Sequence, residues 1–505
     1  MVALAALVGA TPAAAAAKGP ARPPVVLLTL DEFPLDSLLG PDGRIDAERY
    51  PNFAALAATS SWFPDATTVY DETIRAVPAI LDARLPRPEA LNTLADHPQN
   101  AFTLFGGAGY RVVASEEATA MCPRRYCPGA PETSAMRHYL AGGRVHRFDR
   151  WLREIEPGPP AFYYKHLFLP HGPRRYLPSG KEIAPSRPGP LSGLTGPAGF
   201  FDRGLTNENH ARYLLQLGFT DRLLGRLIRR LRSRGMFDRA LVVVTADHGF
   251  AFDVGVPDRR SVTRRNIDEI APVPLFIKGP GQRRAHVGMQ YARTVDVLPT
   301  IAGIAGLRIP WHHAGRPVWD PSVRSRRGVR IVARDFSHSV TIGARHLLER
   351  RRANILRAWH LFGTGAESRR LYGSPYGALY RVGPHPSLID RKVSSVRGGT
   401  PSRAHVRLPD AHRWRAVDTR SPVLPVKVAG VITQPGHRTE RDLAVAVNGR
   451  VRAVGRSVRL RGGHDELFSV LVPEHALRQG RNSVRVYEVT GRGSRLALHP
   501  MKGDG

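Results

Sequence analysis

Carboxylate and imidazole groups follow two apolar runs of this 505-residue chain. Asp31 and Glu32 follow the run VVLLTL, and Asp247, His248 and Gly249 follow the run LVVVTA. Aspartate and histidine together suit zinc or manganese, whereas a ligand set richer in oxygen suits calcium or magnesium. A metal held by these groups would polarise an ester oxygen and lower the pKa of a bound hydroxyl. Taken singly, each residue could instead serve as a turn or cap residue. Whether they form a site therefore depends on the strands and helices that position them.

Four apolar segments predict buried strands, and each of them ends in polar groups. They are VVLLTL, AFYYKHLFLP, LVVVTA and VPLFIK. Between the second and third, residues 210–235 repeat apolar side chains at three-, four- and seven-residue steps, which predicts a helix. A helix that leads into a buried strand forms an α/β unit, and right-handed crossovers then give a parallel sheet. Since sites form at the carboxyl ends of such strands, we expect His171 and Lys278 to join the two acidic strand ends.

The segment YDETIRAVPAIL, residues 70–81, places a threonine between acidic residues and an apolar run. If Thr73 were the N-cap of a helix, Pro78 would be its fifth residue, where the proline ring disfavours a regular helix. A helix that begins nearer Pro78 is easier to build. We therefore expect Thr73 to lie on the loop before the helix, free to face a metal.

The formal net charge is +31, from 74 Lys and Arg against 43 Asp and Glu. A positive field of this size favours anionic partners: phosphate or sulfate esters, anionic lipids or cell-wall polymers. An arginine-rich proteome would give the same excess. The chain has no zinc-finger spacing and no aromatic RNA-binding signature, so a nucleic-acid partner is disfavoured. The oligomeric state is left open.

The length predicts two or three domains. Residues 1–20 are Ala-rich and form a signal-like or membrane-proximal segment, which predicts an extracytoplasmic, secreted or membrane-associated protein. Residues 21–320 are expected to form an α/β catalytic domain, and 321–415 a mixed extension or linker. Residues 416–492 are expected to form a β-rich, sandwich-like accessory domain, because Asn448-Gly449 separates two alternating strands as a hairpin turn.

The chain contains two cysteines, Cys122 and Cys127, which lie five positions apart. In a chain with an export-like N-terminus, this spacing favours a small disulfide loop over a metal site, which would need further ligands.

These motifs resemble, in their order, the sulfatase-like members of the alkaline phosphatase superfamily. The similar segments, spread over residues 24–320, are VVLLTLDEF, YDETIRAVPAIL, LPHGP, TDRLLGRLIRRLRSRGMFDRALVVVTADHG, VPLFIKGPG and VDVLPTIAGIAG. The resemblance implies an α/β/α sandwich with a mostly parallel central sheet. It also implies transfer of a phosphoryl or sulfuryl group, assisted by one or two divalent ions: manganese, zinc, calcium or magnesium.

Position by position, the resemblance assigns a role to each candidate residue. Thr73 occupies the place of the nucleophile, His171 that of a substrate-contacting or proton-donating histidine, and Lys278 is a candidate for substrate binding. The implied metal ligands are Asp31, Glu32, Asp247 and His248.

Two departures from the family pattern bear on the reaction. Sulfatases carry Cys-x-Pro-x-Arg or Ser-x-Pro-x-Arg, whose first residue becomes formylglycine, whereas this chain has Thr73 there and Val77 at the arginine position. Threonine cannot be converted in that way. The segment that usually supplies a Lys-x-His pair carries Ser115, Glu116 and Glu117 instead. A threonine nucleophile resembles the phosphodiesterases and lipoteichoic acid synthases of the same superfamily.

The resulting hypothesis is a metal-dependent phosphoester hydrolase or phosphotransferase that acts on an anionic extracytoplasmic substrate, a lipid or cell-wall polymer among the candidates. Thr73 would attack phosphorus, and His171 would help to protonate the leaving alkoxide. One alternative is a sulfuric ester hydrolase that works without formylglycine. Another is a non-catalytic polyanion-binding protein of the same fold.

Overall fold

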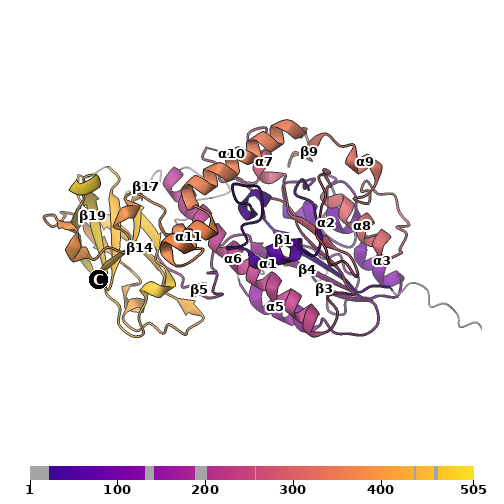
Figure 1. Ribbon diagram of the computed structural model, residues 1–505, viewed down its shortest axis with the longest axis horizontal. Coiled ribbons are helices and arrows are strands. Elements are labelled where there is room, and N and C mark those ends of the chain that lie inside the picture. The colour runs from indigo at the N-terminus through magenta and orange to yellow at the C-terminus, as the bar shows by residue number, and fades with distance from the viewer. Residues whose placement is uncertain are drawn as a thin grey trace, which may run out of the picture.

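A large α/β domain and a smaller β-rich domain lie side by side in the protein (Figure 1). The computed structural model describes residues 22–130, 142–187, 202–255, 258–436, 439–459 and 465–504. The signal-like segment 1–20 lies outside these ranges. Within them, no helix combines the length and the apolar character needed to cross a bilayer.

The α/β domain is built on a seven-stranded sheet with the order β3-β4-β1-β6-β7-β2-β8. Its four parallel strands are β3 (Arg111–Ser115), β4 (Ala161–Pro170), β1 (Val25–Asp31) and β6 (Leu241–Ala246). The remaining strands are β7 (Leu275–Lys278), β2 (Ser61–Trp62) and β8 (His286–Val287). Every residue of β1, β4, β6 and β7 is buried, as their continuous apolar runs predicted.

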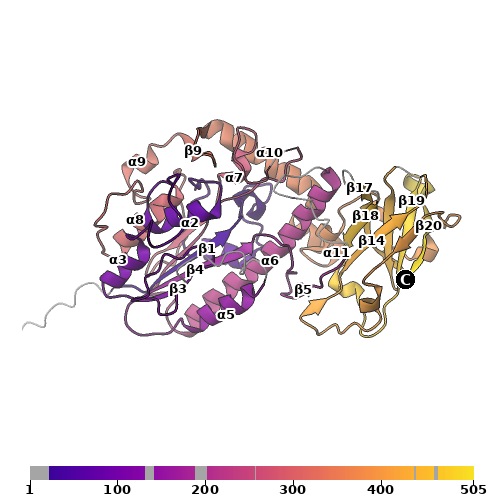
Figure 2. The same ribbon diagram turned by 180° about the vertical axis from the view of Figure 1, so that it is seen from behind.

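Helices cover both faces of this sheet, which confirms the predicted α/β/α sandwich (Figure 2). Alternate residues of β1 enter opposite cores: Leu28 and Leu30 face one layer, whereas Leu27 faces the other. The first layer contains α1 (Pro51–Ala57), α5 (Arg144–Arg153) and α6 (Arg203–Ser233). The second contains α2 (Thr73–Asp82), α3 (Ala101–Gly107) and α8 (Val297–Ile304). The long helix predicted between the second and third strands is α6.

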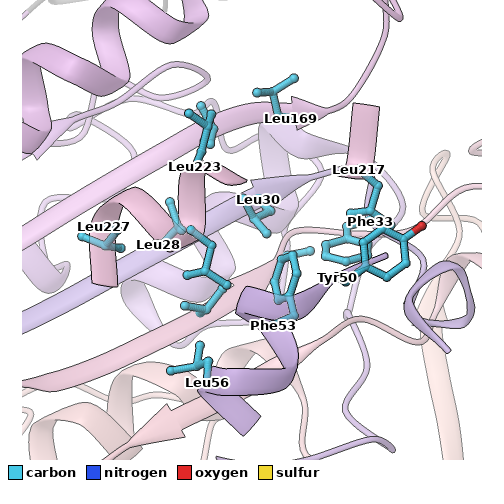
Figure 3. Packing of buried hydrophobic residues seen from close by; sticks show 14 of the residues in the cluster. Leu28, Leu30, Phe33, Tyr50, Phe53, Leu56, Leu169, Leu217, Leu223 and Leu227 are labelled. Atoms are coloured by element: carbon cyan, nitrogen blue, oxygen red, sulfur yellow. The ribbon is translucent and has the colours of Figure 1, made fainter. Parts of the chain in front are cut away.

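Phe53 fills the centre of the first layer, between α1 and the sheet (Figure 3). Its ring lies 5.5 Å from that of Phe33 and 5.9 Å from that of Phe276, measured between centroids. We expect Phe53→Ala to lower the free energy of unfolding by about 3–5 kcal/mol, because it leaves a cavity that the packed layer cannot close. Urea denaturation measures the change. Leu91→Ala, at a side chain 61% exposed, should stay within about 0.5 kcal/mol of wild type, and an equal loss in both variants would contradict this packing.

Strand β7 runs antiparallel to β6, and this reverses the expected position of one candidate residue. Lys278 pairs with Val242, near the beginning of β6, whereas Asp247 follows the end of that strand. Val242 and Asp247 are five residues apart along the chain, which corresponds to about 16 Å of extended strand. The prediction that Lys278 joins the other polar strand ends is therefore wrong, because the carboxyl end of an antiparallel strand lies at the opposite edge of the sheet.

Helix α2 begins at Thr73 and contains Pro78 as its sixth residue. The expectation that Thr73 lies on a loop before the helix is therefore wrong. The proline removes one backbone N–H bond, the one to the carbonyl of Ile74. Burial of Val77, Ile80 and neighbouring apolar side chains of α2 against the sheet offsets that loss. Thr73 consequently lies in the first turn of the helix.

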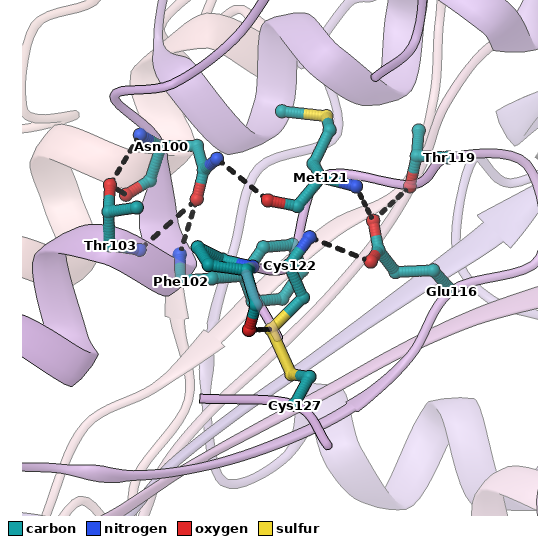
Figure 4. Close-up of a disulfide and its surroundings, with 9 residues drawn as sticks. Asn100, Phe102, Thr103, Glu116, Thr119, Met121, Cys122 and Cys127 are labelled. Carbon is teal, nitrogen blue, oxygen red and sulfur yellow. Dashed lines mark hydrogen bonds between the residues drawn. A yellow bond between two sulfur atoms is a disulfide. The ribbon is translucent and has the colours of Figure 1, made fainter. Parts of the chain in front are cut away.

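The predicted small disulfide loop is present: Cys122 and Cys127 are joined, with their Cα atoms 6.0 Å apart (Figure 4). Glu116 organises this loop, since its carboxylate accepts hydrogen bonds from the Thr119 hydroxyl and from the backbone N–H groups of Met121 and Cys122. The residue therefore has a structural role.

The segment after α8 contains α9 (Pro321–Arg324), the antiparallel hairpin of β9 (Gly328–Val332) and β10 (Ser339–Gly343), and two helices, α10 (Ala344–Phe362) and α11 (Gly365–Tyr372).

Two five-stranded sheets form the β-rich domain. The first contains β11 (Arg397–Gly398), β20 (Ala497–Pro500), β19 (Val484–Thr490), β15 (Asp442–Val447) and β16 (Arg450–Arg456). The second contains β17 (Val458–Arg459), β18 (Glu466–Leu471), β14 (Lys427–Thr433), β12 (His405–Arg407) and β21 (Lys502–Asp504). These strands extend beyond the predicted range 416–492 at both ends.

The predicted hairpin joins β15 to β16 through Asn448 and Gly449, both with positive φ (51° and 78°), as a type I′ turn requires. The β-rich domain also pairs with the α/β domain, because β13 (Val423–Leu424) forms a two-stranded sheet with β5 (Glu182–Ile183).

Candidate metal centre

Three adjacent strands bring Asp31, His166 and Asp247 together at the carboxyl edge of the sheet. Asp31 ends β1, His166 lies in β4, and Asp247 follows β6. One ligand atom from each residue lies within 4.8 Å of the other two, and the His166 Nε2 to Asp31 Oδ2 distance is 3.6 Å. Sequence reasoning missed His166. Its signal was the pair of polar residues Lys165-His166 inside a strand that is otherwise almost entirely apolar.

Most polar atoms of this group lack hydrogen bonds. Within the described ranges, both carboxylate oxygens of Asp31, Oδ2 of Asp247 and both ring nitrogens of His166 are buried without a partner. Buried polar atoms are nearly always paired, because an unpaired one loses its hydration without compensation. A cluster of buried carboxylate oxygens and an imidazole therefore fits a divalent cation, and its mixture of oxygen and nitrogen favours manganese or zinc.

The electrostatics of the group favour the same conclusion. Burial raises the pKa of Asp31 well above its usual value, and the nearby carboxylate of Asp247 raises it further. Burial also raises the pKa of Asp247. The pKa of His166 is lowered by burial to about 3, so the ring is neutral at pH 7 and can offer a lone pair. A bound cation would reverse the penalty for ionising both aspartates.

Thr73 faces this group through His248. The Thr73 Oγ1 lies 3.1 Å from His248 Nε2, which in turn lies 3.5 Å from Asp247 Oδ2. The other ring nitrogen, His248 Nδ1, lies 2.7 Å from the carbonyl oxygen of Gly249. Since a carbonyl can only accept, Nδ1 carries the proton and Nε2 presents a lone pair, to which the Thr73 hydroxyl donates. The arrangement pairs a hydroxyl with an acceptor able to remove its proton.

Gly249 is required by close backbone packing beneath His248. A Cβ at this position would lie 2.3 Å from the carbonyl oxygen of Glu269. The turn that follows β6 therefore depends on glycine.

Glu32 lies beside the group, but its carboxylate points elsewhere. Its backbone N–H donates to Asp247 Oδ1 at 3.2 Å, and its φ of 53° turns the side chain away from Asp31. The carboxylate instead lies within 4 Å of basic side chains, namely Arg259, His171, Arg174 and Arg260. The structure thus corrects the expectation that Glu32 completes the metal-ligand shell.

The ionisation of Glu32 follows from these neighbours. Burial by itself raises the pKa of this carboxyl, but Arg259, His171 and the other two arginines together hold it well below its usual range.

His171 lies at the same edge of the sheet, on the Glu32 side of the site. Its Nε2 is 3.5 Å from Glu32 Oε1, and its Nδ1 donates to the carbonyl of Gly172 at 2.5 Å. Burial lowers the pKa of His171 to about 3, so the ring is neutral at pH 7. This placement suits contact with a substrate better than proton donation.

The remaining candidate positions lie away from the group. Lys278 Nζ donates to the carbonyls of Gly279, at 3.1 Å, and Asp238, at 3.4 Å, at the opposite edge of the sheet. Glu117 is buried against Lys165, with 2.5 Å between Nζ and Oε1, and against a second cation, Arg147. That ion pair occupies the segment where the family resemblance implies a Lys-x-His pair.

Arg334 approaches the Thr73 segment from the β9–β10 hairpin, and sequence reasoning missed it. Its Nη1 bonds Asp258 at 2.6 Å, and its Nε lies 3.6 Å from Asp71 Oδ1. Asp71 also accepts the backbone N–H of Val262 at 2.8 Å. The hairpin therefore ties the loop after β6 to the segment that carries Thr73.

Comparison with known proteins locates the similarity in the α/β domain. The family model described as Sulfatase matches residues 23–307. Arylsulfatase K from Bos taurus is 30% identical over 105 residues, which is 21% of this chain and 19% of that protein. The extracellular sulfatase SULF-1 homolog from Drosophila melanogaster is 26% identical over 175 residues, 34% of this chain and 15% of that protein. The chain thus spans about a fifth, or less, of the length of these curated relatives.

Solved structures with a similar fold include two phosphonate monoester hydrolases. That of Silicibacter pomeroyi is 19% identical, with 61% of this chain and 79% of that chain covered and a TM-score of 0.45. That of Agrobacterium radiobacter is also 19% identical, with 63% and 81% covered and a TM-score of 0.46.

Proposed function

Because the chain belongs to the sulfatase family, we propose that it is a metal-dependent hydrolase or transferase of phosphoric esters with Thr73 as its nucleophile. One observation carries the proposal: Thr73 Oγ1 lies 3.1 Å from His248 Nε2, beside the buried group of Asp31, His166 and Asp247. A hydroxyl in contact with a proton acceptor, next to unpaired carboxylates, is the arrangement that nucleophilic catalysis on an ester requires.

A divalent ion would be held by Asp31, Asp247 and His166, while His248 Nε2 faces the Thr73 hydroxyl. When bound, the ion would polarise the ester oxygen and lower the pKa of a nearby hydroxyl. Manganese and zinc suit this mixed set best, while calcium and magnesium prefer more oxygen ligands.

The residues of the chain then have separate roles. His248 Nε2 accepts the Thr73 proton as the hydroxyl oxygen attacks phosphorus, so a threonine–phosphorus bond forms while the bond to the leaving alkoxide breaks. In an in-line displacement the leaving alkoxide departs on the side of phosphorus opposite Thr73 and His248, so it takes its proton from water there. The His248 imidazolium returns its proton to Thr73 when the threonine–phosphorus bond breaks. Water completes hydrolysis, whereas a sugar or glycerol hydroxyl completes transfer. His171, neutral and on the Glu32 side, contacts the substrate.

The threonine itself favours phosphorus chemistry. Formylglycine cannot be made from Thr73, so the family's usual route for sulfate esters is closed to this chain. The charge of +31 favours an anionic substrate. With the signal-like N-terminal segment, it supports an extracytoplasmic substrate such as a lipid or a cell-wall polymer.

A substrate panel tests the proposal. Phosphomonoester, phosphodiester and sulfate ester analogues with one common leaving group are assayed with manganese, zinc, calcium and magnesium. We expect a phosphate ester to give the highest kcat/KM, with manganese or zinc. A sulfate ester cleaved faster than its phosphate analogue would instead establish the sulfuric ester hydrolase. A protein that binds no metal and cleaves no ester would fit the polyanion-binding alternative.

A further inference from the structure

Three guanidinium groups surround the carboxylate of Glu32, immediately beside the candidate metal centre. Arg259 Nη2 lies 2.9 Å from Glu32 Oε1, Arg174 Nη2 lies 3.7 Å from Oε2, and Arg260 Nε lies 3.8 Å from Oε1. We call Arg174, Arg259 and Arg260 the arginine cluster. Because the Glu32 backbone N–H donates to Asp247 Oδ1 at 3.2 Å, the residue that the cluster surrounds adjoins the candidate metal centre.

The arginine cluster carries more charge than Glu32 neutralises. Three cations lie around Glu32, and the second carboxylate near them, Asp258, lies 3.9 Å from Arg260 Nε and is shared with Arg334. Within the described ranges the Nε atoms of Arg174 and Arg260 and Oε2 of Glu32 are buried without a hydrogen-bond partner. The Arg174 side chain is 6% exposed, so water offers little compensation. Clustered, poorly hydrated guanidiniums with donors to spare are suited to an additional anion.

Aromatic rings hold two members of the cluster in place. The Arg174 guanidinium carbon lies 5.2 Å from the ring centroids of both Tyr213 and Phe250, and that of Arg259 lies 5.9 Å from Phe250. Such cation–π contacts fix the guanidinium planes before a ligand arrives. The Arg259 and Arg260 side chains are 17% and 19% exposed, whereas the Glu32 side chain is fully buried, so an incoming anion meets these two arginines first.

We propose that the arginine cluster is a second anion subsite, which binds a phosphate of the substrate other than the one that reacts. The proposal rests on the function proposed above and deepens it, since it names the substrate class: esters with two neighbouring phosphates, as in a phosphodiester repeat. The planar guanidinium fork matches the oxygens of a phosphate group. Glu32 is the internal counter-ion that the second phosphate displaces.

The first test compares two substrates that differ by one phosphate group. One is the p-nitrophenyl phosphodiester of glycerol, and the other is the same compound with a second phosphate on the terminal glycerol hydroxyl. For wild type we expect the two-phosphate compound to have the higher kcat/KM. In the double variant Arg259→Gln/Arg260→Gln that preference should fall by about tenfold to a hundredfold, because charge-assisted hydrogen bonds to the second phosphate are lost.

A matched control changes two arginines elsewhere. Arg283 and Arg345 have side chains 78% and 88% exposed. The variant Arg283→Gln/Arg345→Gln therefore lowers the net charge of the protein by two, as Arg259→Gln/Arg260→Gln does, but leaves the arginine cluster unchanged. This control should keep the substrate preference. The proposal is overturned if the two double variants lower the preference equally, or if neither lowers it.

The second test measures binding without turnover, so that failure of the subsite and failure of the catalytic proposal are distinguishable. Calorimetry follows inorganic pyrophosphate and orthophosphate binding to manganese-loaded Thr73→Ala protein, with and without Arg259→Gln/Arg260→Gln. We expect the arginine changes to weaken pyrophosphate more than orthophosphate, even if no ester is cleaved by the wild type. Equal weakening of both anions would overturn the subsite alone.

Glu32→Gln gives a prediction of opposite sign. Without the competing carboxylate, pyrophosphate should bind more tightly than to wild type, while manganese affinity is retained. Loss of manganese from this variant would instead make Glu32 a metal ligand and would overturn its role as displaceable counter-ion. If Glu32→Gln fails to fold, the Arg259→Gln/Arg260→Gln variant still tests whether the arginine cluster binds a second phosphate.

Discussion

Thr73→Ala is expected to lower turnover of phosphate esters by at least about 10³-fold while leaving metal affinity close to that of wild type. The substitution removes the oxygen that would attack phosphorus, and without it neither a covalent intermediate nor its proton transfer to His248 can occur. The three buried residues that define the candidate metal centre remain unchanged. Steady-state kinetics measure the first effect, and calorimetric titration with manganese and zinc measures the second.

Two further substitutions at this position separate chemistry from packing. Thr73→Val keeps the branched shape of the side chain and should be as inactive as Thr73→Ala. Thr73→Ser keeps a hydroxyl and should retain measurable turnover. Activity of Thr73→Ala close to wild type would show that the hydroxyl is not the nucleophile, whatever the metal content.

Asp247→Asn is expected to abolish both metal binding and turnover, yet to stabilise the metal-free protein. The carboxylate is fully buried, and its Oδ2 has no hydrogen-bond partner in the described part of the chain. An asparagine can keep the Oδ1 contacts to the backbone N–H groups of Glu32 and His248. It also removes a buried charge next to Asp31, which should raise the free energy of unfolding by about 1–3 kcal/mol.

Thermal unfolding with and without metal measures both the loss of metal binding and the higher stability of the metal-free variant. Metal at 100 times its dissociation constant should stabilise wild type by about 2.7 kcal/mol and the variant hardly at all. Asp238→Asn, at a side chain 61% exposed, should behave as wild type. A metal-dependent increase in the melting temperature of Asp247→Asn equal to that of wild type would contradict the ligand assignment.

The stability difference should also depend on pH in a defined direction. Burial raises the pKa of both Asp31 and Asp247 in the folded protein, whereas aspartate in the unfolded chain titrates near about 3.9. The contribution of these two aspartates to the stability of the metal-free fold is therefore greatest at pH values below about 3.9, and it is lost as the pH rises through the raised folded values. The advantage of Asp247→Asn without metal should accordingly be small near pH 4 and grow towards pH 7.

The fold class and most of the polar strand ends could be predicted from local sequence patterns. The buried strands can be recognised as continuous apolar runs because a strand buried on both faces has no polar side. Helix α6 can be recognised by its 3.6-residue period because one face of the helix packs on the sheet. The hairpin at Asn448-Gly449 followed from a local backbone requirement for positive φ. Local chemistry also identified the disulfide loop and the Asp247-His248-Gly249 turn.

Tertiary structure decided what depends on direction and on neighbours. The apolar run of β7 does not state whether the strand is parallel, and its antiparallel pairing moved Lys278 to the far edge of the sheet. Burial of α2 outweighed the local cost of Pro78, so the helix begins at Thr73. His166 lies in the metal group because β4 is next to β1 in the sheet. Glu32 lies outside it because its positive φ directs its carboxylate towards arginines from two separate segments, Arg174 and the consecutive pair Arg259 and Arg260. Such outcomes arise from the packing of distant segments, and of these residues His166 alone had a local signal, the polar pair Lys165-His166 in an apolar strand.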